Sequence, residues 1–271
     1  MKSIETYIVD SFTDVPFKGN PAGVCIVPQA LTDTLMLLIA QELGLSETAF
    51  IKQLDQASTY SIRFFSPKME IPLCGHATLA SARIVFEKNP EFNKIHFINI
   101  QDLDLAIERD GEMIKMEFPV YDTSPAQAPA ALLQALGIQE TNNVEFNEQT
   151  QILLIEINDS QVLANLNPDF EALQRSHNSI NGVLVTAPSK RNNYDFESRY
   201  FWPWSGTNED PVTGGTHTFL TKYWSTRLGK TRMRSFQCSA RTGFMEVELV
   251  SPIKCIIKSQ AQIIFEGRLR V

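Results

Sequence analysis

Several common sequence signals are missing or scarce in this chain of 271 residues, and each absence excludes a class of protein. Its four cysteines contain no Cys-x-x-Cys pair, so the sequence predicts neither a zinc module nor a disulfide framework. The formal net charge is −7, which argues against a nucleic-acid or anionic-membrane surface because both need a basic patch. No apolar run approaches a membrane span, and residues 1–5 lack the apolar run of a signal peptide. We therefore expect a cytoplasmic protein with reduced thiols and neither nucleic-acid nor membrane partners.

The remaining composition is ordinary for a globular protein. Hydrophobic residues make up 43% of the chain and charged residues 20%, so a core can form without disulfides or metals. The length fits one large domain or two ordinary ones. No low-complexity segment occurs, and the absence of a Gly-x-Ser-x-Gly elbow leaves a serine-hydrolase site without support.

One motif occurs twice, about half a chain apart. The first copy runs from Arg63 to Ala77 and the second from Arg199 to Thr216. Both contain Arg-aromatic-aromatic-x-Pro followed by Glu-x-Pro-x-x-Gly. The arginines are 136 residues apart, and the glutamates, second prolines and glycines are 139 apart. The repeat predicts two related domains, with a site built between them.

Hydrophobic periodicity predicts many strands and few helices. A helix at 32–43 has Thr32 or Asp33 to cap its start and Gly44 to end it. The helix predicted at 76–87 is apolar almost all round, which is typical of a helix enclosed by a sheet. Residues 119–129 are rich in Pro, Ala and Ser and are interpreted as a linker. Further helices are predicted at 130–136, 168–175 and 216–228, and strands at 7–9, 22–27, 48–51, 61–65, 96–100, 103–107, 113–118, 152–157, 183–186, 196–201 and 243–250.

Each copy of the motif places glycine at the start of an apolar helix. The first N–H groups of a helix have no partner within it and carry partial positive charge, and glycine lets a ligand approach them closely. Gly75, Gly214, Gly215 and Thr216 are therefore candidate residues for binding a small carboxylate. Alternatively, these residues only form tight turns and the repeat is an echo of gene duplication. Both interpretations stay open at this point.

The candidates for acid–base work are Glu47, Cys74, His76, Asp210 and His217. Glu47 lies between a predicted helix and an apolar strand, so burial is expected to raise the pKa of its carboxyl, although a solvated loop glutamate is the commoner case. His76, beside a helix N-terminus, is expected to be a neutral imidazole. Asp210 can equally form a turn, and Cys74 can be an inert buried thiol. Cys74, His76 and His217 lack the spacing of a metal site, so no metal is predicted.

Four segments resemble the signatures of the phenazine-biosynthesis F-type (PhzF-like) isomerases. They run from Asp10 to Ala22, Leu45 to Phe50, Pro72 to Ala80 and Glu209 to Gly214, in the order and spacing of that family. The resemblance covers essentially the whole chain. It implies the α+β fold of diaminopimelate epimerase, in which two pseudo-symmetric domains each wrap a barrel-like, mostly antiparallel sheet around a central helix. The expected domains are residues 1–118 with a returning strand at 263–271, and residues 119–262.

The resemblance also implies an activity. The founding reaction isomerises trans-2,3-dihydro-3-hydroxyanthranilate by moving a proton, and the family is homodimeric and needs no cofactor. Glu47 would take and return the proton, while His76 and Asp210 would position the substrate amine or relay protons. The substrate would lie in the interdomain cleft. Its expected binding residues are Asn20, Cys74, Gly75, Gly214, Gly215 and Thr216.

Two departures from the family pattern concern the substrate. Gly215 stands where Ser is usual, although Thr216 can supply a hydroxyl instead. Thr242 stands where the family often has Gly. Two alternatives therefore accompany the isomerase prediction: an amino-acid racemase or epimerase that uses Cys74 with Asp210, and a non-catalytic homologue that binds a metabolite or a protein. The sequence does not name the substrate or the pathway.

Overall fold

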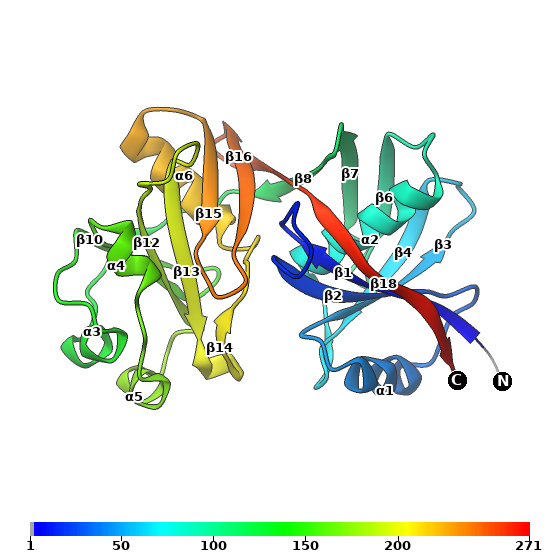
Figure 1. The fold of residues 1–271 in the computed structure, drawn as a ribbon, viewed down its shortest axis with the longest axis horizontal. Helices are drawn as coiled ribbons and strands as arrows, with labels where there is room; N and C mark the ends of the chain where they lie inside the picture. Colours follow the sequence, from blue (N-terminus) through cyan, green and yellow to red (C-terminus); the bar gives the residue numbers. More distant parts are fainter. Residues whose placement is uncertain (1–2) are drawn as a thin grey trace. The chain divides into compact units, whose positions relative to one another are not determined.

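The computed structural model describes residues 3–271 (Figure 1). The chain divides into two compact units. Unit 1 contains the residues up to Glu117 together with Ile257–Val271, and unit 2 contains Phe118–Ile256. The boundaries expected from the sequence, 118/119 and 262/263, lie one and six residues from these. In the part of the chain that is described, no helix combines the length and apolar character needed to cross a membrane.

Unit 1 is a mostly antiparallel sheet around one helix (Figure 1). Its C-terminal strand pairs antiparallel with its first strand along nine residues of the latter. Its strands are β1 (Ser3–Ser11), β2 (Asn20–Ile26), β3 (Thr48–Gln53), β4 (Thr59–Phe65), β5 (Glu70–Ile71), β6 (Lys94–Ile98), β7 (Asp104–Asp110), β8 (Met113–Pro119) and β18 (Ala261–Arg270), and its helices are α1 (Asp33–Leu43) and α2 (Gly75–Lys88).

Unit 2 is built from the same kinds of element. Its strands are β9 (Ser124–Pro125), β10 (Asn143–Asn147), β11 (Ile152–Glu156), β12 (Gly182–Pro188), β13 (Phe196–Trp202), β14 (Thr207–Asp210), β15 (Arg232–Gln237), β16 (Gly243–Ser251) and β17 (Lys254–Ser259), the last of which runs across the unit boundary. Its helices are α3 (Ala130–Leu136), α4 (Ser160–Ala164), α5 (Phe170–Ser176) and α6 (His217–Leu228), with a 3₁₀ turn η1 at Pro203–Ser205.

The pairings repeat from one unit to the other. In unit 1, β2 pairs parallel with β3 across α1, and β4 pairs parallel with β6 across α2. In unit 2, β11 pairs parallel with β12 across α4 and α5, and β13 pairs parallel with β15 across α6. Parallel neighbours need such crossover connections. Pairs of strands that follow one another more directly, such as β1–β2, β3–β4, β10–β11 and β15–β16, are antiparallel. The predicted fold class, α+β with mostly antiparallel sheets around a central helix, is confirmed.

The two central helices are buried on nearly all sides. In α2 nine of 14 residues are buried, including Leu79, Ile84 and Phe86. In α6 eight of 12 are buried, including Phe219 and Trp224. A helix without a polar face can be stable in water only when strands enclose it, so the apolar pattern at 76–87 correctly predicted its place inside the sheet.

Most predicted elements are found within a few residues of their expected bounds. At α1, Thr32 accepts the N–H of Leu35 and Gly44 ends the helix with a φ of 64°, as the capping pattern predicts. The sequence did not reveal β10, α4 or β15. The last of these omissions matters most, because β15 contacts the turn that carries Asp210. All four cysteines are buried free thiols.

Candidate active site

Glu47 is held by the backbone of the strand that follows it. It lies between Gly44, which ends α1, and Thr48, which begins β3. Its carbonyl accepts the N–H of Gly23 in β2 at 3.0 Å, which extends the parallel β2–β3 pairing back to Glu47. Its side chain is 13% exposed. The carboxylate is therefore largely buried and attached to a rigid element.

Glu47 and His76 form a close pair at the start of α2. Nε2 of His76 lies 3.2 Å from Oε2 of Glu47, and Nδ1 of His76 lies 3.4 Å from Sγ of Cys74. The structure thus brings together three of the residues predicted for the site, one from the α1–β3 connection and two from the start of α2, where Cys74 is the N-cap and His76 lies in the first turn.

The charges of this pair differ from the sequence-based expectations. Burial acts to lower the pKa of His76, but the Cys74 sulfur and the Glu47 carboxylate beside its ring raise that pKa well above 6.5. Burial acts to raise the pKa of Glu47, but hydrogen bonding to His76, its charge, and Ser46 together lower it below 4.5. The predictions of a raised Glu47 pKa and a neutral His76 are wrong, because the sequence did not show that the two side chains meet.

Glu47, Cys74 and His76 also form the group of described residues that has the make-up of a metal site. One ligand atom from each lies within 4.8 Å of the other two. Carboxylate, thiolate and imidazole are ligands that zinc accepts. Here the His76 ring already contacts both Glu47 and Cys74, so these two contacts can hold the cluster together without an ion. The expectation of a site without metal stays a prediction.

The start of α2 has no capping side chain. Cys74 is the N-cap residue with extended backbone, its side chain caps no N–H, and the first turn of the helix contains no acidic residue. The Ser11 hydroxyl donates to the His76 carbonyl at 2.7 Å, and the fully buried Asn20 pairs with Ser11 across β1 and β2. Ser11 thus links the strand pair that contains Asn20 to the start of α2, which Gly75 and His76 form. Uncapped N–H groups and the helix dipole favour a carboxylate there.

In unit 2, Asp210 ends β14 at the start of the second turn. It pairs with Tyr200 across β13 and β14, and burial together with the Asp210 charge raises the pKa of Tyr200. The Thr213 hydroxyl donates to Oδ2 of Asp210 at 2.5 Å. The carboxylate is therefore oriented by the turn in which it lies.

The glycines of the second turn precede α6 directly. A Cβ added to Gly215 would meet no atom within 4 Å, so the position where the family pattern has Ser is open space. Thr216 was expected to offer its hydroxyl in place of that Ser. Instead this hydroxyl donates to the Thr213 carbonyl at 3.0 Å. Gly215 is exposed and thus remains open to a ligand, whereas Gly214 is buried and Thr216 contributes to the turn itself.

His217 is a structural residue. It is fully buried, and burial lowers its pKa to about 4 although backbone groups of Thr213 and Gly214 partly offset this effect. Nδ1 lies 3.2 Å from the Thr213 carbonyl oxygen and Nε2 lies 3.0 Å from Oγ of Ser235. A neutral ring that donates from Nδ1 and accepts at Nε2 satisfies both contacts. His217 is therefore a neutral support for the turn and not an acid–base group of the site.

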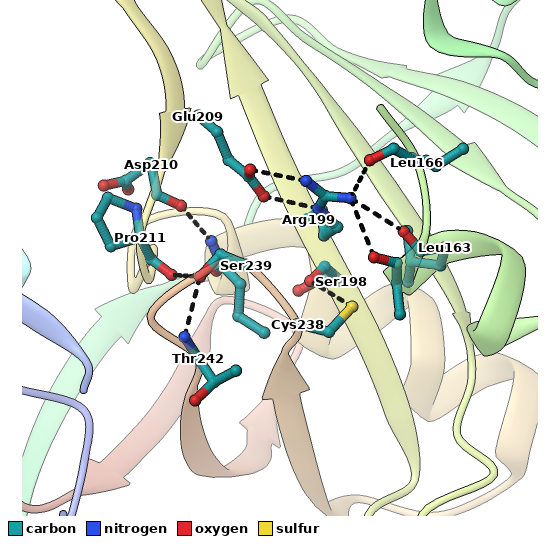
Figure 2. Close-up of polar contacts among 12 residues, drawn as sticks. Leu163, Leu166, Ser198, Arg199, Glu209, Asp210, Pro211, Cys238, Ser239 and Thr242 are labelled. Atoms are coloured by element: carbon teal, nitrogen blue, oxygen red, sulfur yellow. Dashed lines mark hydrogen bonds and ion pairs between the residues drawn. The ribbon is translucent and has the colours of Figure 1, made fainter. Parts of the chain in front are cut away.

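The duplicated motif contains the same ion pair in both units. Nε and Nη2 of Arg63 donate to Glu70 at 2.7 and 2.6 Å. The same nitrogens of Arg199 both donate to Glu209 at 2.7 Å (Figure 2). Arg199 also donates to the carbonyl of Leu166 at 2.6 Å. The arginines and glutamates that revealed the repeat therefore hold each turn strand, β5 or β14, against its neighbour.

Strand register extends this equivalence into the turns. Ile71 pairs with Phe64 just as Asp210 pairs with Tyr200, one residue after the arginine in each unit. Three residues further on, the counterpart of Cys74 is Thr213. Asp210 is therefore not the second-unit counterpart of Cys74, and the racemase alternative pairs two residues that are not equivalent within the repeat.

Sequence reasoning missed two side chains that hold the second turn. Gln237 donates to the Asp210 carbonyl at 2.7 Å and accepts the Thr213 N–H at 2.9 Å. Ser239 donates to the Pro211 carbonyl (Figure 2). Buried positions alternate along β15, but two of them are the polar residues Ser235 and Gln237. The sequence therefore lacks the apolar alternation that would have predicted a strand here.

Comparison with known proteins identifies the family. The family model described as phenazine biosynthesis-like protein matches residues 9–267. This chain belongs to that family. An uncharacterized isomerase of Pseudomonas aeruginosa is 40% identical over 263 residues, which cover 97% of each protein. The crystal structure of a PhzF-family phenazine biosynthesis protein from Enterococcus faecalis has a TM-score of 0.89 at 35% identity and covers 100% of both chains.

A more distant structure extends the likeness of the fold. A predicted epimerase from Pseudomonas aeruginosa has a TM-score of 0.73 at 18% identity and covers 99% of both chains, which shows the fold alone. The PhzF-like resemblance and the epimerase-like fold are thus confirmed. Membership of the family, together with a relative named as an isomerase, supports an isomerase or epimerase. The roles of individual site residues stay predictions.

Proposed function

We propose that this phenazine biosynthesis-like protein is an isomerase that moves a proton on a small substrate bearing a carboxylate, with Glu47 as the acid–base group. The observation that supports this most strongly is the Glu47–His76 contact, 3.2 Å long, beside the uncapped start of α2. A carboxylate base and an anion-binding helix end lie together there. This combination suits removal of a proton from a carbon conjugated with the substrate carboxylate.

Glu47 alone can take and return the proton, so the proposed reaction balances. Ionised Glu47 takes a proton from a C–H bond, and the electron pair of that bond spreads over the conjugated acid. The N–H groups of Gly75 and His76, with the His76 imidazolium, stabilise the negative charge that develops on the substrate carboxylate. Glu47, now protonated, returns the proton to another carbon of the conjugated system. Nothing is oxidised or reduced overall, so the reaction needs no redox cofactor.

The second unit is proposed to complete the substrate site. Asp210 would position a substrate amine, and the N–H groups of Gly214 and Gly215 would bind the carboxylate further. The orientation of Asp210 by Thr213 and the open space at Gly215 support these roles. That a single substrate is held between the two units stays a prediction of the family resemblance.

Solvent deuterium incorporation tests the proposal. The substrates are trans-2,3-dihydro-3-hydroxyanthranilate, L-proline and trans-4-hydroxy-L-proline, incubated with the protein in D₂O and followed by proton NMR. Glu47→Gln is expected to lower the exchange rate by about 10²–10⁴-fold, the usual contribution of a general acid–base group. Glu108→Gln is the matched control, because Glu108 is a glutamate of unit 1 that lies on β7 and forms an ion pair with Lys115. Equal exchange by Glu47→Gln and wild type would remove Glu47 from this role.

The contact of Cys74 with His76 gives the racemase alternative its own test. If Cys74 transfers the proton, Cys74→Ser abolishes exchange at the α-carbon of the two proline substrates. Under the proposal, Cys74→Ser keeps exchange of the conjugated acid, because Glu47 remains. If Cys74→Ser lost exchange of the conjugated acid while Glu47→Gln kept it, the result would favour the racemase alternative.

The assembly and location of the protein are further proposals. The family resemblance implies a homodimer, whereas the cytoplasmic location is an expectation from the sequence. Sedimentation equilibrium measures the mass directly, and a species of twice 30.6 kDa is expected. A single monomeric species at micromolar concentration would contradict the dimer.

A further inference from the structure

We propose that Gln237 is a positioning residue for the Asp210 carboxylate, acting through Thr213. This inference rests on the function proposed above, in which Asp210 contacts the substrate. Gln237 is the last residue of β15 and is 1% exposed, so it does not itself face solvent. Nothing in the expected activity requires a glutamine here, which is why its contacts call for an explanation.

Both the nitrogen and the oxygen of the Gln237 side-chain amide form hydrogen bonds to the turn at residues 210–213. Its Nε2 donates to the Asp210 carbonyl at 2.7 Å, and its Oε1 accepts the Thr213 N–H at 2.9 Å. Nε2 also lies 3.4 Å from Oγ1 of Thr213. A single planar amide thus fixes the distance between the first and the last residue of the Asp210–Thr213 turn.

Thr213 transmits this constraint to the carboxylate. Its hydroxyl donates to Oδ2 of Asp210 at 2.5 Å. Its carbonyl receives the Thr216 hydroxyl at 3.0 Å and the His217 ring nitrogen at 3.2 Å. Every polar atom of Thr213 is therefore engaged, which leaves its side chain no freedom to turn away from Asp210 while Gln237 is in place.

Ser239 closes the neighbouring loop onto the same turn. Its hydroxyl donates to the Pro211 carbonyl and accepts the Thr242 N–H at 3.2 Å (Figure 2). The loop after β15 is therefore attached to the middle of the turn, while Gln237 holds the two ends. Together they keep the turn close to the end of β15.

Comparison with unit 1 shows what Gln237 adds. Strand register makes Asn99 its counterpart: Ser61 pairs with Ile98 in unit 1, and Glu197, 136 residues after Ser61, pairs with Phe236. The residue that follows in each unit, Asn99 or Gln237, is a buried amide.

The two amides bind different atoms of equivalent turns. Asn99 donates to the carbonyl of Pro72, and in unit 2 the equivalent carbonyl, that of Pro211, is held by Ser239 instead. The longer Gln237 reaches the ends of the turn. In unit 1 the residue at the place of Asp210 is Ile71, which has no polar group to orient. The bridging glutamine therefore occurs in the unit whose turn carries a carboxylate, and this difference favours positioning over a purely structural role.

The experiment follows the Asp210 carboxyl in the full-length protein by ¹³C NMR titration, with the Asp210→Asn spectrum to assign it. Gln237→Met keeps the volume of the side chain and removes both hydrogen bonds. We expect it to raise the pKa of the Asp210 carboxyl by about one pH unit, because the Thr213 hydroxyl stabilises the ionised form by roughly one hydrogen bond. Thr213→Val, which deletes that hydroxyl, gives the full effect for comparison.

A matched control separates positioning from stability. Asn147 is a fully buried amide of unit 2 that donates to the Asp122 carbonyl at 2.7 Å and accepts the Thr150 N–H at 2.8 Å. Asn147→Leu is expected to lower stability as Gln237→Met does, without moving the Asp210 titration. If Gln237→Met fails to fold, Gln237→Asn is used instead, since it keeps an amide that is too short to span the turn. An unchanged Asp210 titration in either Gln237 variant would overturn the inference.

Kinetics distinguish failure of this inference from failure of the proposed function. With the exchange assay above, Gln237→Met is expected to lower kcat/KM by about tenfold in the wild-type background and by less than twofold in Asp210→Asn, because the two residues act as one unit. Equal losses in both backgrounds would contradict positioning. If Asp210→Asn alone leaves kcat/KM unchanged, the proposed role of Asp210 fails, while the titration still decides whether Gln237 orients it.

Discussion

Glu47 and His76 are the residues whose chemistry changes most when the structure is considered. The sequence predicts one carboxyl with a raised pKa and one neutral ring. The structure pairs them, and this contact lowers the pKa of the Glu47 carboxyl and raises the pKa of the His76 ring, so each group favours the charged form of the other. Under the proposed function, Glu47 would accept the proton as a carboxylate, and the charged His76 ring would stabilise the developing anion.

The Glu47–His76 pair predicts that the free energy of unfolding falls off at both low and high pH. The lowered pKa of Glu47 contributes stability that is present above 4.5 and is lost as the pH falls through its folded value. The raised pKa of His76 contributes stability that is complete below 6.5 and is lost as the pH rises through its folded value. The difference in unfolding free energy between wild type and His76→Gln, measured in urea, should therefore be largest between pH 4.5 and 6.5. A difference that does not vary with pH would contradict the ion pair.

The backbone conformation of Thr242 predicts that one substitution at this residue stabilises the protein. Its φ is 60°, a left-handed conformation that costs a β-branched residue about 1–2 kcal/mol. Thr242→Gly relieves this strain, partly offset by the greater freedom of glycine in the unfolded chain, and is expected to raise the unfolding free energy by about 0.5–1 kcal/mol. Urea denaturation measures it. A loss of stability would show that the bond from the Thr242 hydroxyl to the Arg241 carbonyl outweighs the strain.

At the scale of elements, the repeated arginine–glutamate pair joins strand to strand in both units but in different surroundings. Arg199 has a side chain 9% exposed and also donates to the backbone carbonyls of Leu163 within α4 and Leu166 just after it. Arg63 is 26% exposed, and its second partner, Asp33, is 78% exposed. The same motif therefore contributes differently to the two units.

This difference can be measured with matched substitutions. Arg199→Met leaves the Glu209 carboxylate and backbone acceptors without partners, at a cost of about 3–5 kcal/mol. Arg63→Met breaks a more exposed pair, at a cost of about 1 kcal/mol. Equilibrium unfolding of both variants gives the comparison. Equal costs, or a larger cost for Arg63→Met, would contradict the dependence on burial.

The sequence predicts elements best where side-chain pattern and burial agree. The helix at 76–87 was found because apolar residues surround it, and α1 because Thr32 and Gly44 mark its ends. β15 was missed because its inward positions include polar Ser235 and Gln237, whose partners lie far away in the sequence. The same long-range contacts conceal the Glu47–His76 pair. The motifs therefore indicate which segments form the candidate site. The pKa shifts of its residues and the side chains that hold its turns depend on contacts between segments far apart in the sequence, which the motifs do not show.

At the scale of the whole molecule, the two units differ in how the chain builds them. Unit 2 is one continuous segment, Phe118–Ile256, whereas unit 1 needs Ile257–Val271 as well, because β18 pairs with β1. We expect residues 118–256 to unfold cooperatively when expressed alone, and residues 1–117 to fold only when 257–271 are fused through a linker. Circular dichroism with urea tests this. A cooperative transition for 1–117 alone would contradict a structural need for β18.

The central claim concerns a single proton, and deuterium incorporation from D₂O into the conjugated acid tests it most directly. Glu47→Gln removes the group that takes and returns the proton but leaves the helix start and its N–H groups in place. The account predicts that incorporation by Glu47→Gln falls by about 10²–10⁴-fold while Glu108→Gln matches the wild type. Incorporation by Glu47→Gln at the wild-type rate would contradict it.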